Sequence, residues 1–166
     1  PKVVGVAANV RMMEEHTALG LLQRYEHIIN YRSKKFYSIT NCEMIIGGVA
    51  STYRRSTMKE VGYYDTDTVT EDIGLSMKIV ALGNKDHRLV YGVDVLASTE
   101  PVETFNILLK QRYRWKMGML QNIRGQLSLL FNINRKYTKS LTWYRMPFAF
   151  IGEVLLLIEP VVVLYL

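Results

Sequence analysis

Gln111-Arg112-Tyr113-Arg114-Trp115 is the stretch of sequence that says most about the architecture and the chemistry of this chain. It lies in a segment that we interpret as one long helix. On that helix Gln111, Arg114 and Trp115 share one face, which Gly118 continues without a side chain. Arginine clamps anionic oxygens in a fork, and an indole stacks on the apolar face of a sugar ring. The face therefore predicts a site for a phosphorylated sugar.

A membrane surface is a second explanation for the same face, because tryptophan prefers the level of the lipid headgroups and arginine extends toward lipid phosphates. Residues 110–145 contain nine basic and no acidic residues, and an apolar segment follows them. This distribution is typical of the cytoplasmic side of a membrane protein. The sequence pattern alone leaves both explanations open.

Glu71-Asp72 precedes the quoted stretch by about forty residues and supplies a candidate base. Transfer of a sugar to a hydroxyl group needs a carboxylate that accepts the hydroxyl proton as the new bond forms. Thr68-Val69-Thr70-Glu71 also fits a capping box, so Glu71 has a structural explanation as a stabiliser of a helix start. The capping box leaves Asp72 unassigned, and Asp72 is our candidate general base, with Glu71 beside it.

A glycine pair, Gly47-Gly48, interrupts a strand-like run at 43–54. Paired glycines weaken a strand, and the usual reason for them is the close approach of a ligand or of another backbone. A bulge or a tight bend is the alternative. We treat both glycines as candidate substrate-binding positions.

Alternating helical and strand-like patterns predict an α/β protein. The chain has 166 residues, enough for one domain with a core of its own. It begins at Pro1 and ends within an apolar run, and we expect it to be part of a longer protein. We expect strands at 2–9, 43–54 and 87–96, a turn at 32–35, and helices at 17–31, 56–61, 68–82, 103–131 and 146–166.

The last of these helices, 146–166, is apolar apart from Glu153 and Glu159 and is long enough to cross a bilayer. The two carboxylates and Pro160 suit a helix that faces a protein interior or a water-filled cavity. We expect a transmembrane helix, with a buried helix of a soluble domain as the alternative.

Net charge and composition limit the remaining function classes. Lys and Arg outnumber Asp and Glu by 21 to 15, a net charge of +6, which permits nucleic acid, anionic lipid or phosphorylated substrates as partners. The single cysteine, Cys42, cannot form a disulfide within the chain and fits a reducing compartment. The three histidines lack the spacing of metal ligands, and Asp65 and Asp67 fit a solvated loop. We expect no metal site within these residues.

Several motifs together resemble the family 2 glycosyltransferases with a GT-A fold, especially the membrane-integrated synthases of cellulose, chitin, hyaluronan and poly-N-acetylglucosamine. Thr-Glu-Asp followed about forty residues later by Gln-x-x-Arg-Trp is the most specific of them. The matching residues, in the order of the family, are Ile46-Gly47-Gly48-Val49, Arg54-Arg55, Val61-Gly62-Tyr63-Tyr64-Asp65, Thr70-Glu71-Asp72, Glu100-Pro101 and Gln111-Arg112-Tyr113-Arg114-Trp115.

The resemblance implies a role for each candidate residue. Asp72 would deprotonate the acceptor hydroxyl, and Gly47 and Gly48 would lie beside the donor and acceptor sugars. Trp115 would stack under the acceptor sugar, while Gln111 and Arg114 would bind the pyrophosphate of the donor or the end of the glycan. The reaction would be the inverting transfer of a sugar from a nucleotide diphosphate sugar, most simply a UDP-sugar, to a growing β-linked glycan, processively and with export.

The resemblance also implies an organisation for the chain. Residues 1–102 would be the acceptor-side half of a partial GT-A (Rossmann-like) domain, 103–145 amphipathic interfacial helices, and 146–166 the transmembrane helix. Mg²⁺ or Mn²⁺ and the nucleotide would be bound by residues upstream of this chain, so the fragment alone would be inactive. The protein would lie in the cell (inner) membrane with its catalytic part in the cytoplasm.

The partners expected from the resemblance are a nucleotide-sugar donor, a glycan or lipid acceptor, membrane lipids and an export or regulatory subunit, with no nucleic acid. Two alternatives remain at this stage. One is a non-processive glycolipid synthase of the same fold. The other is a basic module that binds a membrane surface or nucleic acid, because aromatic residues among basic ones also serve base stacking.

Overall fold

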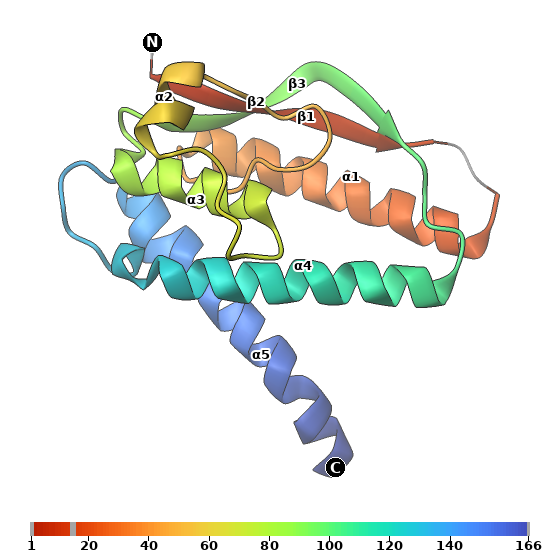
Figure 1. Cartoon of the computed structure of the whole chain (residues 1–166). Helices are drawn as coiled ribbons and strands as arrows, with labels where there is room; N and C mark the ends of the chain where they lie inside the picture. Colours follow the sequence, from red (N-terminus) through yellow and green to blue (C-terminus); the bar gives the residue numbers. More distant parts are fainter. Residues whose placement is uncertain (1, 14–15, 166) are drawn as a thin grey trace.

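A small mixed sheet forms one side of the molecule. The computed structural model describes residues 2–13 and 16–165, with side chains up to residue 155. Within these residues the sheet has three strands in the order β2-β1-β3, namely β1 (Val3–Met12), β2 (Thr52–Tyr53) and β3 (Arg88–Thr99). β3 is parallel to β1, and β2 is antiparallel to it. Figure 1 shows the long helices gathered on one side of this sheet, and the predicted mixed α/β class is confirmed.

The central strand β1 is apolar because it is covered closely. Val4, Ala7 and Ala8 are buried, as expected for the short Val- and Ala-rich run. At Gly5 a side chain would have no room, since its Cβ would lie 2.8 Å from a methyl carbon of Leu89. The strand predicted at 2–9 is therefore confirmed and is longer than expected.

Helix α1 (Ala18–Ile39) begins where the sequence predicts and continues through the predicted turn at 32–35. Thr17 caps its start by accepting a hydrogen bond from the Gly20 N–H at 3.1 Å. The turn prediction is wrong because residues 32–35 are polar but helix-compatible, and Lys34 reaches across to donate to the Ile45 carbonyl at 2.9 Å. The apolar stripe that predicts this helix is largely exposed at Leu21, Leu22, Tyr25, Ile28 and Ile29.

The strand predicted at 43–54 is wrong except for the two residues of β2. The main chain turns at Gly48 and Ala50, which both have positive φ. Before the turn, Ile46 bonds through its backbone to the Ser76 side chain rather than to a neighbouring strand. Met44 and Ile46 are nevertheless fully buried, so apolar burial rather than sheet pairing explains the strand-like composition.

Two shorter helices follow. The predicted helix at 56–61 is confirmed as α2 (Arg55–Glu60), and Gly62 follows its end with φ of 79°. Helix α3 (Glu71–Gly83) carries the core residues Leu75, Ile79 and Val80 on its buried side. Its N-cap is Thr70, so the predicted capping box at 68–71 is wrong. Thr70 turns its side chain toward a partner on another helix instead of capping its own.

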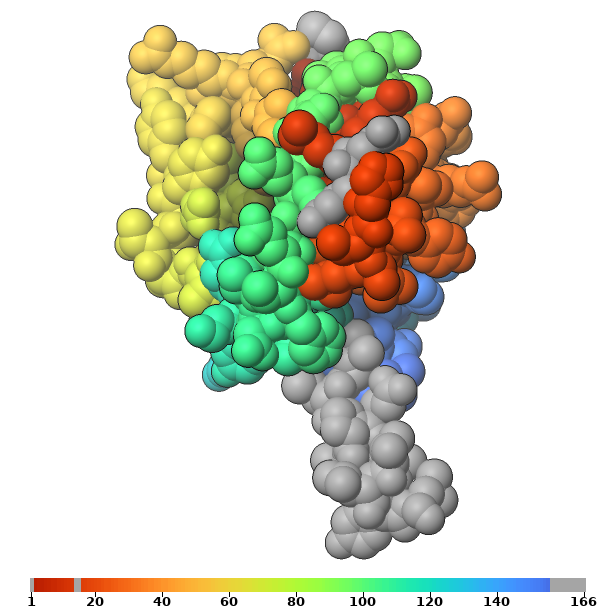
Figure 2. Space-filling view, turned by 90° about the vertical axis from the view of Figure 1, so that its right-hand side faces the viewer, coloured from red at the N-terminus to blue at the C-terminus, as the bar shows by residue number. Residues whose placement is uncertain are grey.

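The long helix predicted at 103–131 is α4 (Phe105–Gly125), followed by the short 3₁₀ helix η1 (Leu127–Leu129). Thr104 caps the start of α4. Just before it, the Gln23 side chain of α1 accepts a hydrogen bond from the Val102 N–H at 3.0 Å and donates one to the Val102 carbonyl at 3.1 Å. Figure 2 shows the resulting contact end-on, with the segment before α4 (green) against the beginning of α1 (orange-red).

The C-terminal part consists of a π-helical stretch, η2 (Ser140–Arg145), and α5 (Met146–Tyr165), which leads away from the body of the molecule (Figure 1). Leu141, Met146 and Ala149 are buried in the same core as Val4 of the sheet. The start of α5 therefore belongs to the folded domain.

The structure confirms a helix in the apolar run at 146–166 but not the predicted membrane span. Leu166 and the side chains from 156 onward lie outside the described part. Among the residues that are described, no helix is both long enough and apolar enough to cross a bilayer.

Candidate active site

One cleft brings together most of the residues that the sequence singles out. It has a volume of about 830 Å³ and lies between α1, the segment 43–48, the start of α3, α4 and the start of α5. Six of the seven candidate residues line it: Gly47, Gly48, Glu71, Asp72, Arg114 and Trp115. Residues that lie far apart in the sequence therefore meet around one space.

Asp72 lies in the first turn of α3 with its carboxylate half-buried in the wall of this cleft. Its Oδ1 accepts a hydrogen bond from the Ile73 N–H at 2.8 Å. Oδ2 lies against Gly47, where an added Cβ would collide with it and would lie 2.7 Å from the carboxyl carbon. Gly47 is thus small because the main chain passes directly beside the carboxylate.

The second glycine of the pair answers a different requirement. Gly48 has φ of 80°, and no described atom lies within 4 Å of the position of its Cβ. Its backbone conformation, and not lack of space, favours glycine. The tight bend offered by the sequence therefore explains Gly48, whereas Gly47 meets a side chain, the Asp72 carboxylate, rather than the ligand or second backbone expected from the sequence.

A buried hydrogen-bond network fixes the segment 44–47 beside Asp72. The Ser76 hydroxyl lies 2.7 Å from the Ile46 carbonyl oxygen and accepts from the Ile46 N–H at 3.1 Å. The Tyr53 hydroxyl donates to the same carbonyl and lies 2.9 Å from Ser76 Oγ. Burial raises the pKa of Tyr53 well above its usual range, so its hydroxyl stays protonated and remains a donor. These bonds hold Gly47 against α3.

Helix α4 contacts the Thr70-Glu71-Asp72 segment through Gly118. A Cβ at Gly118 would collide with the Thr70 hydroxyl and would lie 2.7 Å from Thr70 Cβ. Asn122, one turn further along, donates to Thr70 Oγ1 at 3.2 Å and to the Gly118 carbonyl at 2.8 Å. Asn122 also closes the contact on α3, because a Cβ at Gly74 would lie 2.9 Å from its Oδ1. The helix that carries Trp115 is thereby fixed to the segment that carries Asp72.

Sequence reasoning missed Asn122 and assigned no contact to Gly118. Gly118 and Asn122 lie four residues apart on one face of a helix, and this spacing is the signal that was available. A small residue followed at that spacing by an amide is typical of a close helix crossing. The contact partner, Thr70, could not be read from the spacing.

The face that α4 presents to the cleft is rotated relative to the predicted one. Among the described residues, Arg112 and Met119 line the cleft, whereas Gln111 does not. Arg112 does not belong to the predicted face, yet its guanidinium lies 4.4 Å from the centroid of the Trp115 ring and pairs with Glu26 of α1. Trp115 is 38% exposed, and Arg112 covers one face of its indole.

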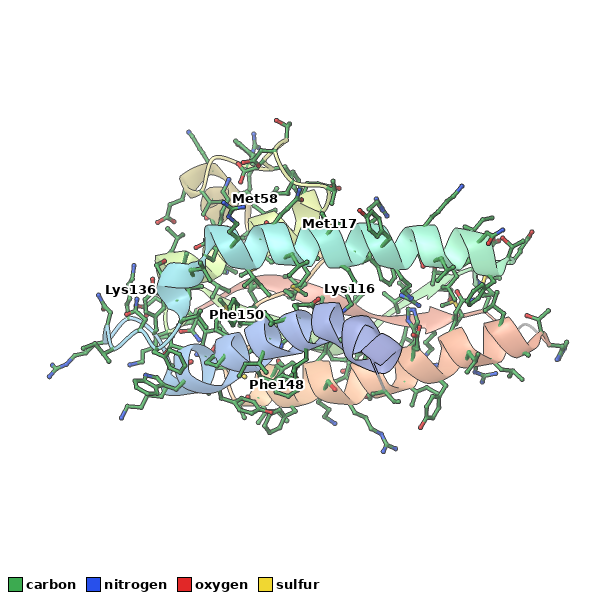
Figure 3. All side chains as sticks on the ribbon, turned by 90° about the horizontal axis from the view of Figure 1, so that it is seen from below. Met58, Lys116, Met117, Lys136, Phe148 and Phe150 are labelled. Atoms are coloured by element: carbon green, nitrogen blue, oxygen red, sulfur yellow. The ribbon has the colours of Figure 1, made fainter. Side chains whose placement is uncertain are left out.

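A second ion pair joins α4 to α5 at the edge of the cleft. Lys116 donates to both carboxylate oxygens of Glu153 at 3.0 and 3.1 Å. Figure 3 shows Lys116 between α4 and α5, seen from below. Glu153, one of the two carboxylates noted in the apolar run, is thus neutralised by the helix that bears Trp115.

The carboxylates of this part of the chain do not fit a divalent cation. Among the side chains that the structure describes, those of residues 2–13 and 16–155, no group of three or more His, Cys, Asp and Glu has an arrangement that could hold a metal ion. Glu26 and Glu153 are already paired with basic side chains, and Asp65 forms an ion pair with Lys78 at 2.8 Å. The metal that the resemblance implies therefore has no ligand set here.

Taken together, the cleft offers a fixed carboxylate, an indole platform and several cations in one space. A hydroxyl group that binds beside Asp72 can pass its proton to the carboxylate. A sugar ring can stack on Trp115, and Arg114 can bind anionic oxygens. The arrangement is therefore suited to a reaction at a sugar hydroxyl in the presence of a phosphate.

Comparison with known proteins identifies the family. A family model, Glycosyl transferase family group 2, matches residues 2–166. Two curated relatives are named poly-beta-1,6-N-acetyl-D-glucosamine synthase: the one from Staphylococcus epidermidis is 34% identical over 119 residues, and the one from Staphylococcus aureus (strain COL) is 32% identical over 119 residues. Each alignment covers 71% of this chain, and the chain spans only 28% of the length of each relative. The chain belongs to glycosyl transferase family group 2.

Proposed function

We propose that the whole protein transfers a sugar, with inversion, from a nucleotide diphosphate sugar to a growing β-linked glycan. The observation that carries this proposal is the contact of Asp72 with Gly47 in the wall of a cleft that Arg114 and Trp115 also line. A carboxylate held in place beside a sugar platform is what a single displacement at a hydroxyl acceptor requires.

In the proposed reaction Asp72 is the general base. The acceptor hydroxyl binds beside its carboxylate, and its oxygen attacks the anomeric carbon of the donor. As that bond forms, the hydroxyl proton passes to Asp72 and the bond to the diphosphate breaks, so that the leaving group departs as an anion. Glu71, exposed beside Asp72, adds a second carboxylate at this position, and the indole of Trp115 stacks against the acceptor ring.

The cations of the site have separate tasks in this proposal. Arg114 binds the pyrophosphate of the donor or the end of the glycan. Arg112 holds the indole of Trp115 between itself and the sugar. Mg²⁺ or Mn²⁺ and the nucleotide are bound by residues outside this chain, so the described part alone does not turn over.

The names of the curated relatives support N-acetylglucosamine as the transferred sugar. UDP-N-acetylglucosamine is then the donor that we propose. We further propose a GT-A fold for the complete domain, processive synthesis, and a place at the inner membrane with the catalytic part in the cytoplasm. The nine basic residues of 110–145 support contact with anionic lipids. A subunit for export or regulation belongs to the same proposal.

Release of UDP by membranes that carry the full-length protein tests this function. UDP-N-acetylglucosamine, UDP-glucose and UDP-glucuronic acid are offered separately with Mg²⁺, to wild type and to Asp72→Asn. We expect release with one donor and a loss of at least about 100-fold in the variant. Asp65→Asn, which removes a carboxylate that is paired with Lys78 outside the cleft, is the matched control and should keep the activity. Full activity in Asp72→Asn would overturn the assignment of the base.

A further inference from the structure

The end of the cleft that faces the C-terminus of α1 contains a buried carboxylate that is only half used. Glu43 is 3% exposed. Its Oε1 accepts hydrogen bonds from the N–H groups of Met44 and Ile45, both at 3.0 Å. Its Oε2 has no hydrogen-bond partner among the described residues. The hydrogen bonds to the neighbouring backbone give Oε1 a structural role, whereas Oε2 has none.

A guanidinium in the same region is also incompletely used. Arg145, the last residue of η2, lies with its Cζ 4.2 Å from the centroid of the Tyr37 ring. Its Nε is buried and, within the described chain, donates to no acceptor. π-helical turns such as η2 are frequent at functional sites, because the wider turn re-aims one side chain.

Glu43 and Arg145 surround the same tyrosine without forming an ion pair. Burial raises the pKa of Tyr37, the charge of Arg145 opposes this rise, and the charge of Glu43 adds to it. Arg145 lies over the Tyr37 ring, and Glu43 donates its backbone N–H to the Tyr37 carbonyl at 3.1 Å, so both residues adjoin Tyr37. Both also line the cleft, together with Lys34. A buried acceptor oxygen and a buried donor N–H, neither with a partner among the described residues, therefore lie around one tyrosine at this end of the cleft.

The mixed charge of this end restricts the ligand that it can bind. A phosphate would be repelled by Glu43, and a metal cation would be repelled by Arg145 and Lys34. A neutral group that both donates and accepts hydrogen bonds satisfies Glu43 and Arg145 at once. The hydroxyl and amide groups of a sugar unit have this character, and a tyrosine ring beside them adds an apolar contact.

The position of this end relative to Asp72 fits a second unit of the same glycan. Gly47 is four positions after Glu43 in the sequence, so their Cα atoms are at most about 14 Å apart. Gly47 in turn lies directly against the Asp72 carboxylate. A short oligosaccharide that enters the cleft can therefore reach both places.

We propose that Glu43 and Arg145 form a subsite for a sugar unit of the acceptor glycan that lies behind the unit at Trp115 and Asp72. Glu43 Oε2 accepts a hydrogen bond from a hydroxyl or amide group of that unit, and Arg145 Nε donates to one of its oxygens. This inference rests on the proposed glycan transfer and adds to it a residue pair that makes longer acceptors bind more tightly.

The test compares acceptors of different length in the full-length protein in membranes. Oligosaccharides of one to four units of the transferred sugar are offered with the active donor, and KM and kcat are measured from UDP release. In wild type, KM falls as the acceptor grows beyond one unit. In Glu43→Gln, which preserves the size of the side chain and one acceptor oxygen, we expect KM for the longer acceptors to rise about tenfold or more, with a smaller change in kcat.

Two further variants separate the subsite from a general loss of folding. Arg145→Lys keeps the positive charge but removes the Nε donor, and it should raise KM for the longer acceptors in the same way. Glu103→Gln changes an exposed carboxylate outside the cleft, and it should keep the length dependence of wild type. Thermal unfolding of all three purified proteins shows whether they are folded.

The outcomes distinguish the subsite from the proposed function. If wild type transfers sugar and Glu43→Gln keeps the wild-type dependence on acceptor length, the subsite is wrong and the function stands. If wild type releases no UDP with any donor, the proposed function fails. Calorimetric binding of the four-unit oligosaccharide then tests the subsite by itself, and equal affinity of wild type and Glu43→Gln would overturn it.

Discussion

Gly47 shows how a missing side chain can serve catalysis. The backbone of Gly47 takes a place that a methyl group would share with the Asp72 carboxylate. We predict that Gly47→Ala displaces this carboxylate and lowers kcat about 100-fold, because a positioned base contributes 100-fold or more. KM for the donor should change less than kcat, since the added methyl group meets the Asp72 carboxylate and not Arg114, to which we assign the pyrophosphate. Steady-state UDP release by the full-length protein measures both values.

Gly152→Ala provides the control for this substitution. Gly152 lies in α5, and no described atom lies within 4 Å of its Cβ position, so the same chemical change there meets open space. It should leave kcat within about twofold of wild type. If Gly47→Ala were as active as Gly152→Ala, the contact with Asp72 would have no catalytic importance.

At the scale of residues, the sequence predicted which side chains matter better than how they face one another. Asp72, Arg114 and Trp115 were predicted from residue type and motif order, and the structure places them around one cleft. The place of Arg112 in the cleft was not predicted. Successive helical residues point about 100° apart, so a small rotation of α4 exchanges one face of the helix for the next. That rotation depends on the contact of Gly118 with Thr70, which lies 48 residues away in the sequence.

At the scale of elements, the crossing of α3 and α4 depends on Gly118. Any side chain at Gly118 would overlap Thr70. We predict that Gly118→Ala forces α4 away from the start of α3 and destabilises the fold by about 1–3 kcal/mol, as expected for overpacking of a tight contact. For a chain of this size that loss lowers the melting temperature by about 2–12 °C. Thermal unfolding followed by circular dichroism measures the shift.

The same helix contains the matched control. Gly125 is the last residue of α4, and no described atom lies within 4 Å of its Cβ position. Gly125→Ala should be neutral or slightly stabilising, because alanine favours a helix over glycine by up to about 1 kcal/mol. Equal melting temperatures for Gly118→Ala and Gly125→Ala would contradict a close crossing at Gly118.

Elements were predictable from the sequence where their hydrogen bonds are local. The backbone hydrogen bonds of α2 and α4 lie within each helix, Thr104 caps the start of α4, and the existence of both helices was predicted correctly. The segment 43–54 was not, because the backbone of Ile46 bonds to Ser76, thirty residues away. The capping box failed because α3 begins at Glu71, so that Thr70 and not Thr68 is the N-cap, and Asn122 of another helix donates to the Thr70 hydroxyl. Local propensity contains no information about such distant partners.

At the scale of the whole molecule, one core joins the sheet to the C-terminal helices. Buried residues from Val4 in β1 to Ala149 in α5 form a single cluster, which includes Leu75 of α3 and Ile123 of α4. The cleft lies where these elements meet. At the edge of the cleft, the ion pair Arg112–Glu26 connects α4 to α1, and the ion pair Lys116–Glu153 connects α4 to α5. The geometry of the site is therefore a property of the complete packing rather than of one motif.

Because this core buries tyrosine hydroxyl groups, it should weaken at high pH. Burial raises the pKa of Tyr91 to about 12, and it raises that of Tyr53 even further above the usual value of 10. Between pH 10 and 12 the unfolded chain loses these protons while the folded chain keeps them, so the free energy of unfolding falls as the pH rises through this window. Tyr91→Phe removes one such proton and should make the melting temperature less dependent on pH in that range. Tyr113→Phe is the control, because Tyr113 is 69% exposed and its loss should leave the slope unchanged. Thermal unfolding at intervals from pH 8 to pH 12 measures the slopes, and identical slopes for wild type and Tyr91→Phe would show that burial of this hydroxyl does not limit stability.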